Sequence, residues 1–312
     1  MKLILLLITL FYSSISFSQD YYEYYEGINQ AKISLIEDKL EQSLNHYHRT
    51  FEQFDFVFAR DCFNALEVAS KVGNQNQADY FLRRCLKQGI ELSFLERYSL
   101  LTALKATPFW TKILSDKDSL RQIYLQNVNW ELRKEVIEMF TEDQEIRDLA
   151  DKNRFNIFKK KKLSQQFIEI DRKLVQRLIQ ITEEYGFPGE KLIGIDHHTM
   201  HPKIETKNLT AGMPIVILIH NYSQPNQSFN SIFIDEIVKG NLFNAHFATI
   251  ADFQYTFGNE ENNEHLCHSK MFRPELADEI INENREQIKL LSISNTWSLN
   301  RKKTITPKYY LY

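Results

Sequence analysis

Apolar residues near the start of the chain recur at spacings of three and four, which is the period of one face of an α-helix. Gly73 and Gly89 follow two of these stripes, at places where a helix commonly ends. The pattern therefore predicts four short amphipathic helices in succession. Their stripes are Tyr24, Ile28, Ala31 and Leu35; Leu40, Leu44, Tyr47 and Phe51; Phe58, Cys62, Ala65 and Ala69; and Ala78, Leu82 and Cys85.

Longer helical patterns occupy the middle of the chain. One helix is expected over Asp118 to Phe140, and Thr141 is expected to begin the next, because Thr141-Glu142-Asp143-Gln144 has the form of a capping box. A third is predicted over Leu163 to Tyr185. Gly186-Phe187-Pro188-Gly189 then reads as a structural turn that ends this helix and places Phe187 in the core.

The pattern is less regular in the last third of the chain. Residues 190–213 show little periodicity and are expected to form a long loop. The run Ile215 to Ile219 fits a buried strand, whereas Pro214 in front of it favours a helix. Further helices are predicted at 229–239, 245–257 and 274–291, and no pattern is visible in 295–312.

The predicted short helices contain a weak internal repeat. A shift of 35 residues places Ile28 on Phe63, Asn29 on Asn64, and Tyr47 on Leu82. This period resembles the tetratricopeptide repeat, whose unit is about 34 residues, although the Trp and Pro residues typical of that family are absent. The resemblance implies either an array that binds a protein or peptide along its concave face or a purely structural scaffold.

Composition agrees with a helical protein. The chain has only 9 Gly and 7 Pro in 312 residues, fewer than many tight turns between strands would need. We therefore expect a mainly α fold: a helical-repeat, tetratricopeptide-like array at 19–115, a helical C-terminal domain with at most minor β content at 116–294, and a tail at 295–312. The net charge of −3 argues against a broad basic surface for nucleic acid.

The first 18 residues have the features of a signal peptide. Met1-Lys2 is positively charged, Leu3 to Tyr12 is apolar, and Ser16-Phe17-Ser18 supplies the small residues before a cleavage site. The apolar stretch is shorter than the roughly 20 residues that a transmembrane helix needs. We expect a periplasmic or secreted protein with no membrane span in the mature chain.

Export would expose the cysteines to an oxidising compartment. The chain has three: Cys62, Cys85 and Cys267. Cys62 and Cys85 are nearly equidistant from Gly73-Asn74, so a helix hairpin would let them face each other. The sequence leaves open a disulfide between them and a role as two small core residues.

A second resemblance covers roughly residues 141–268. Asp143-Gln144-x-x-Arg147, a helix led by Asp171, Gly186-Phe187-Pro188, His220 and Asp252 occur in the order seen in an uncharacterised bacterial domain-of-unknown-function family. Several polar residues of that family's pattern are replaced here, for example next to His220 and Asp252. The resemblance implies a fold more than a function.

His220 is the best candidate for chemistry, because an imidazole at the end of an apolar segment can act as a general base. In this hypothesis Asp252 orients His220, Arg147 attracts an anionic group, and the protein is a hydrolase. The alternative is a core histidine whose ring bonds to the backbone or to Asp143.

Metal and cofactor sites are not expected. His197, His198 and His201 have a spacing that could bind zinc on a helix, but Pro202 opposes a helix there. His265-x-Cys267-His268 lacks a further ligand pair. The sequence thus favours an exported protein- or peptide-interaction module, with the hydrolase as the alternative.

Overall fold

The computed structural model describes residues 19–96, 101–153, 157–196, 209–220, 230–257, 267–271 and 274–302. Within these ranges the chain forms fifteen helices and no strand, which confirms the mainly α prediction. The signal peptide, the histidines at 197, 198 and 201, and His265 lie outside the described residues. None of the described helices is both long and apolar enough to cross a membrane.

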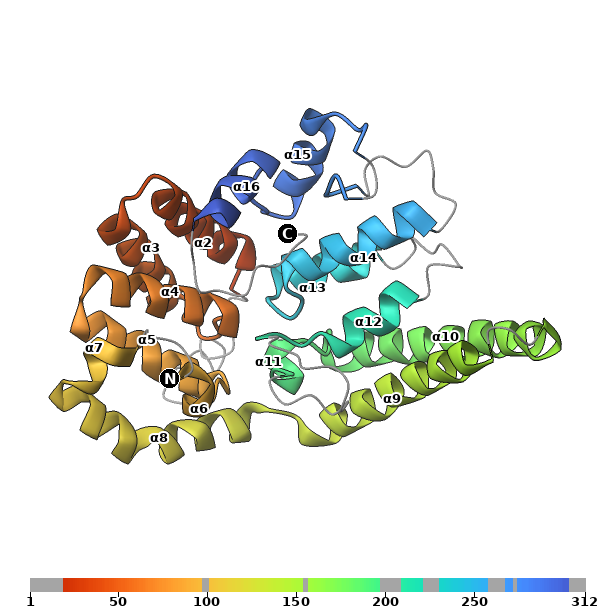
Figure 1. Cartoon of the computed structure of the whole chain (residues 1–312), viewed down its shortest axis with the longest axis horizontal. Coiled ribbons are helices and arrows are strands. Elements are labelled where there is room, and N and C mark those ends of the chain that lie inside the picture. The colour runs from red at the N-terminus through yellow and green to blue at the C-terminus, as the bar shows by residue number, and fades with distance from the viewer. Residues whose placement is uncertain are drawn as a thin grey trace, which may run out of the picture.

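The four predicted short helices are all present and pack as two helix hairpins (Figure 1). Gly73, with a φ of 77°, ends the third helix in the left-handed conformation that glycine adopts without strain. The helices are α2 (Tyr21–Ile36), α3 (Leu40–Gln53), α4 (Ala59–Val72) and α5 (Gln75–Lys87).

The array continues into longer helices at positions that differ from the prediction. After α6 (Leu92–Leu95) and α7 (Thr102–Lys105), helix α8 (Pro108–Asn127) packs against α5, and α9 (Trp130–Lys152) follows. The prediction of a single helix over 118–140 is wrong, because α8 ends at Asn127 and a new helix, α9, begins at Trp130. Asn129 caps α9 by accepting the Leu132 N–H at 3.1 Å.

Thr141 does not begin a helix. It lies inside α9, where its hydroxyl donates to the Ile137 carbonyl at 2.8 Å, the bond by which a threonine is accommodated within a helix. The boundary expected between residues 115 and 116 falls inside α8.

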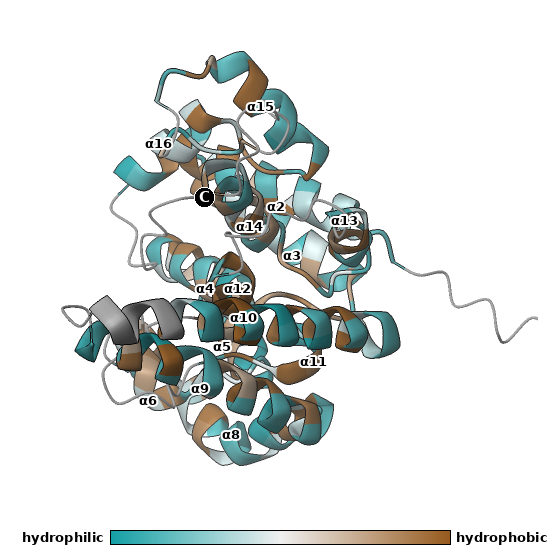
Figure 2. Ribbon diagram, turned by 90° about the vertical axis from the view of Figure 1, so that its right-hand side faces the viewer, coloured by the Kyte–Doolittle hydropathy of each residue, from teal (hydrophilic) through white to brown (hydrophobic). Residues whose placement is uncertain are grey.

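The C-terminal half is built around α9 and the long α10 (Ile157–Tyr185), which lie side by side (Figure 1). The ambiguous apolar run forms a helix, α12 (Met213–His220), which contacts α9, α10 and α14 and is largely hydrophobic (Figure 2). The remaining helices are α11 (Glu190–Ile193), α13 (Asn230–Val238), α14 (Asn244–Phe257), α15 (Asp278–Gln287) and α16 (Ile293–Arg301).

Helix α16 corrects the expectation of a patternless tail from residue 295. The Ser292 side chain caps it by accepting the Asn295 N–H at 3.3 Å, and α16 packs against α2 near the start of the chain. A short helix with few apolar residues is stabilised by such contacts rather than by its own sequence.

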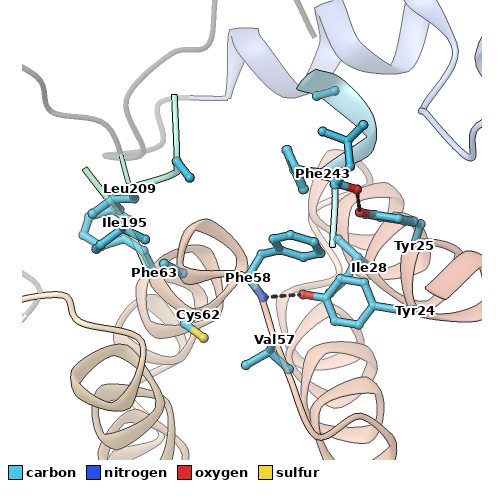
Figure 3. Packing of buried hydrophobic residues seen from close by; sticks show 14 of the residues in the cluster. Tyr24, Tyr25, Ile28, Val57, Phe58, Cys62, Phe63, Ile195, Leu209 and Phe243 are labelled. Carbon is cyan, nitrogen blue, oxygen red and sulfur yellow. Dashed lines mark hydrogen bonds between the residues drawn. The ribbon is translucent and has the colours of Figure 1, made fainter. Parts of the chain in front are cut away.

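The two halves share one hydrophobic core. Tyr25 and Phe58 meet Phe243 from the C-terminal half, with the Phe58 and Phe243 ring centroids 4.9 Å apart, and Tyr24 packs against Tyr25 and Phe58 (Figure 3). The Tyr25 hydroxyl donates to the Leu242 carbonyl at 3.2 Å. Because aromatic residues contribute large buried areas, this junction ties the repeats to the rest of the fold.

A buried carboxyl group also crosses this junction. Glu190 of α11 accepts the Ala59 N–H at 3.0 Å and so caps α4, whose N-cap residue Phe58 has no side-chain acceptor. Burial raises the pKa of Glu190 to about 8, an effect that the hydrogen bond from Ala59 opposes.

Cys62, Cys85 and Cys267 are buried and free. Burial raises the pKa of both Cys62 and Cys85, which keeps them as protonated thiols. In the structure Cys62 and Cys85 are therefore small core residues and do not form a disulfide.

The turn after α10 has the predicted form. Gly186 has a φ of 90°, and Phe187 is buried with 1% of its surface exposed. The Phe187 ring meets that of Phe233 on α13 edge-on at 5.9 Å, and its N–H donates to Glu236 at 2.7 Å.

Candidate functional site

Four polar side chains meet where α9, α10 and α12 come together. Asp143 and Arg147 lie one turn apart on α9, Asp171 lies on α10, and His220 is the last residue of α12. We refer to these four residues as the histidine cluster. The nearest carboxylate oxygen of Asp143 lies 2.8 Å from the His220 Nδ1 atom, and Arg147 contacts both Asp143 and Asp171 at 3.0 and 2.9 Å.

The Nδ1 atom of His220 has two close neighbours, one a hydrogen-bond donor and the other a hydrogen-bond acceptor. The Arg147 Nε–H lies 2.8 Å from it as a donor, while Asp143 lies at the same distance as an acceptor. If Nδ1 carries the proton, it donates to Asp143 and leaves Nε2 as a base. If Nδ1 is bare, it accepts from Arg147 and the proton resides on Nε2. Each neutral form of the ring therefore satisfies one of these two neighbours and is opposed by the other.

Burial differs across the histidine cluster. The Asp143 side chain is fully buried, whereas the side chains of Arg147 and His220 retain 22% and 23% of their exposure. Burial raises the pKa of Asp171, and the nearby Arg147 guanidinium opposes this shift. Two buried carboxylates are costly unless they are paired, so Arg147 stabilises the arrangement by contacting both.

Arg147 was expected to attract an anionic group. In the structure its Nη2 atom contacts Asp143 and Asp171, and its guanidinium lies over the Phe167 ring at 5.0 Å. These contacts hold Arg147 in place and use much of its hydrogen-bonding capacity within the protein. Arg147 thereby contacts both carboxylates and the imidazole of His220.

Asp252 was expected to orient His220. In the structure this role falls to Asp143, while Asp252 is buried on α14 and accepts the His268 N–H and the Ser269 hydroxyl at 2.5 and 2.6 Å. Asp252 thus anchors the segment 267–271 to α14. The contact between His220 and Asp143 is the one named in the alternative of a core histidine, whereas Asp252 lies on α14, whose rotation only packing determines.

The Asp143-Gln144-x-x-Arg147 motif contains two residues of the histidine cluster, but the hydrolase hypothesis from the sequence used only Arg147. Asp143 begins Asp143-Gln144-x-x-Arg147, and its i, i+4 spacing places Asp143 and Arg147 on one helix face. Gln144 adds a hydrogen bond from its amide to Asp143 at 2.7 Å. For Asp171 the sequence predicts only that it begins a helix of the motif.

Metal binding finds no support in the part of the chain that the structure describes. No group of three His, Cys, Asp or Glu side chains there is arranged to hold a metal ion. His268 is buried, with its Nδ1 atom 3.8 Å from Asp252.

Comparison with known proteins adds no assignment: no family model, curated protein or solved structure matches this chain.

Proposed function

We propose that the histidine cluster is the acid–base site of a hydrolase-type enzyme, with His220 as the group that transfers a proton. The supporting observation is the 2.8 Å contact between the buried Asp143 carboxylate and Nδ1 of a histidine that is partly exposed. A carboxylate in this position fixes the ring and stabilises the imidazolium that forms when the other nitrogen accepts a proton.

In the first step Nε2 of His220, whose Nδ1 carries a proton, takes a proton from a water molecule as the water oxygen bonds to the electrophilic atom of the substrate. Asp143 stabilises the resulting imidazolium, and the bond from the electrophilic atom to the leaving group then breaks. The same ring then returns the proton to the leaving group. Arg147 holds Asp143 and Asp171 in place, which keeps the carboxylate beside Nδ1. This mechanism requires neither a metal nor a cofactor.

The test is a screen of the mature chain against p-nitrophenyl esters, phosphates and glycosides. We expect His220→Gln to lower the rate on any accepted substrate by about 10²-fold or more, and Asp143→Asn to do so as well. His46→Gln changes a histidine on α3, outside the cluster, and should leave the rate unchanged.

Thermal melts of all variants separate loss of the fold from loss of chemistry. A rate that survives in folded His220→Gln would refute the proposal, as would the absence of turnover with every substrate class. In the second case the cluster would be a structural link between three helices.

A second role, that of an exported protein- or peptide-interaction module, is supported by the repeats. Asn29 on α2 and Asn64 on α4 lie 35 residues apart, each in the first helix of its hairpin. Two helix hairpins in this register are typical of arrays that bind a partner. Export is tested by N-terminal sequencing of the mature protein, which should begin at Gln19. Partner binding is tested by capture from an envelope extract, with an unrelated exported helical protein as control, and recovery of no specific partner would contradict it.

A further inference from the structure

A pocket lies between the repeats and the C-terminal helices, and the histidine cluster does not contribute to it. One wall is a continuous face of α2 and α4. The opposite wall comes from the start of α14 and from the segment that joins and includes α15 and α16. Figure 1 shows α16 beside α2.

The pocket is closed on one side by hydrogen bonds. The Asn29 amide donates to the Lys289 carbonyl at 2.9 Å, and the Asn244 amide donates to the Ile288 carbonyl at 2.9 Å. These bonds attach the loop between α15 and α16 to α2 and α14. The chain's own helices therefore cover the inner face of the first hairpin, and the space that remains suits a compact molecule rather than an extended peptide.

Positive charge dominates the lining. Lys32, Arg60, Lys71 and Arg285 face a single carboxylate, Glu67, which pairs with Lys71 at 2.7 Å. A second carboxylate, the fully buried Asp61, lies 3.7 Å from Lys32. The residues that line the pocket thus include four cationic side chains and one carboxylate.

Two of these cations, Lys32 and Arg285, are held in poorly hydrated surroundings. Arg285 is 2% exposed and donates to the His268 and Leu291 carbonyls, so its charge is fixed beside the pocket. Burial lowers the pKa of Lys32, which reflects the cost of keeping an ammonium group away from water. An anion in the pocket would offset that cost.

Part of the remaining lining is apolar and offers a surface for a hydrophobic body. Tyr25, Tyr47 and Phe243 supply aromatic rings, and Leu35, Leu290 and Leu299 supply aliphatic groups. Binding sites for small molecules combine such apolar walls with a few polar groups that set orientation.

We propose that this pocket binds a compact organic anion, in which one carboxylate or phosphate group faces Lys32, Arg60 and Asn64 and an aromatic or aliphatic body contacts the apolar walls. This site goes beyond both functions proposed above, because it names a ligand that neither the hydrolase nor a bound peptide requires.

Isothermal titration calorimetry on the mature chain tests the proposal with three probes of similar size: phenylacetate, phenyl phosphate and the neutral phenylacetamide. At least one anion should bind at millimolar concentration, about tenfold or more tighter than the amide, and added salt should weaken it. Binding of phenylacetate alone would identify a carboxylate ligand, and binding of phenyl phosphate alone would identify a phosphate ester. The proposal is overturned if neither anion binds or if the amide binds equally well.

Asn64→Asp locates the site, because it adds a negative charge to the pocket with almost no change in shape. It should weaken anion binding about tenfold or more. Asn127→Asp adds the same charge at an exposed position on α8 and should have no effect. Full affinity in folded Asn64→Asp would overturn the assignment. His220→Gln should retain anion binding, so loss of the hydrolase proposal and loss of this one can be told apart.

Discussion

Replacing Phe187 by alanine should destabilise the protein substantially. The side chain is 1% exposed and its ring packs edge-on against Phe233, so almost all of its contacts lie in the core. Truncation of a buried phenylalanine typically costs about 3–5 kcal/mol, from lost burial and from the cavity that remains. The chain of 312 residues has an unfolding entropy of about 0.7 kcal/mol/K if it unfolds as one unit, so the melting midpoint should fall by about 5–8 °C.

Thermal unfolding followed by circular dichroism measures this shift. The matched control is Tyr185→Ala, an aromatic residue at the end of α10 in the same turn region that is 51% exposed. The control should cost less than about 1 kcal/mol. If the two variants lower the midpoint equally, Phe187 does not support the core, and the turn becomes a candidate binding surface.

Three further variants test individual contacts. Burial raises the pKa of Glu190 from 4.5 to about 8, so between these pH values the folded state keeps a proton that the unfolded chain releases. The free energy of unfolding should therefore fall as the pH rises from 4.5 to about 8. Glu190→Gln should flatten the curve of melting midpoint against pH. Gly240→Ala should cost at least about 1 kcal/mol in urea unfolding, because Gly240 has a φ of 72° and a Cβ atom would lie 2.5 Å from the Tyr21 ring. Asn129→Ala should cost about 1 kcal/mol in the same assay through loss of the α9 cap, whereas an unchanged transition would refute that role.

The sequence by itself determined the helical class and many helix ends. Apolar spacing identified α2 to α5, and Gly73 and Gly186 marked the ends of α4 and α10, because helical period and left-handed glycines are local properties. Local sequence patterns gave wrong predictions where two of them indicated different structures. Residues 141–144 have the sequence of a capping box, but α9 continues through them. Helix α16 was not predicted, because its apolar residues show no strong helical period.

Tertiary structure alone decided how the histidine cluster is assembled. The sequence supplied His220 and Arg147 and contained Asp143 and Asp171, but it assigned the orienting carboxylate to Asp252. Which carboxylate meets an imidazole depends on the rotation and contact of α9, α10, α12 and α14, and side-chain spacing within one helix carries no information on that. The anion pocket has the same origin, because its cations come from α2, α4 and α15, far apart in the chain, and only the packing of those helices gathers their charge around one space.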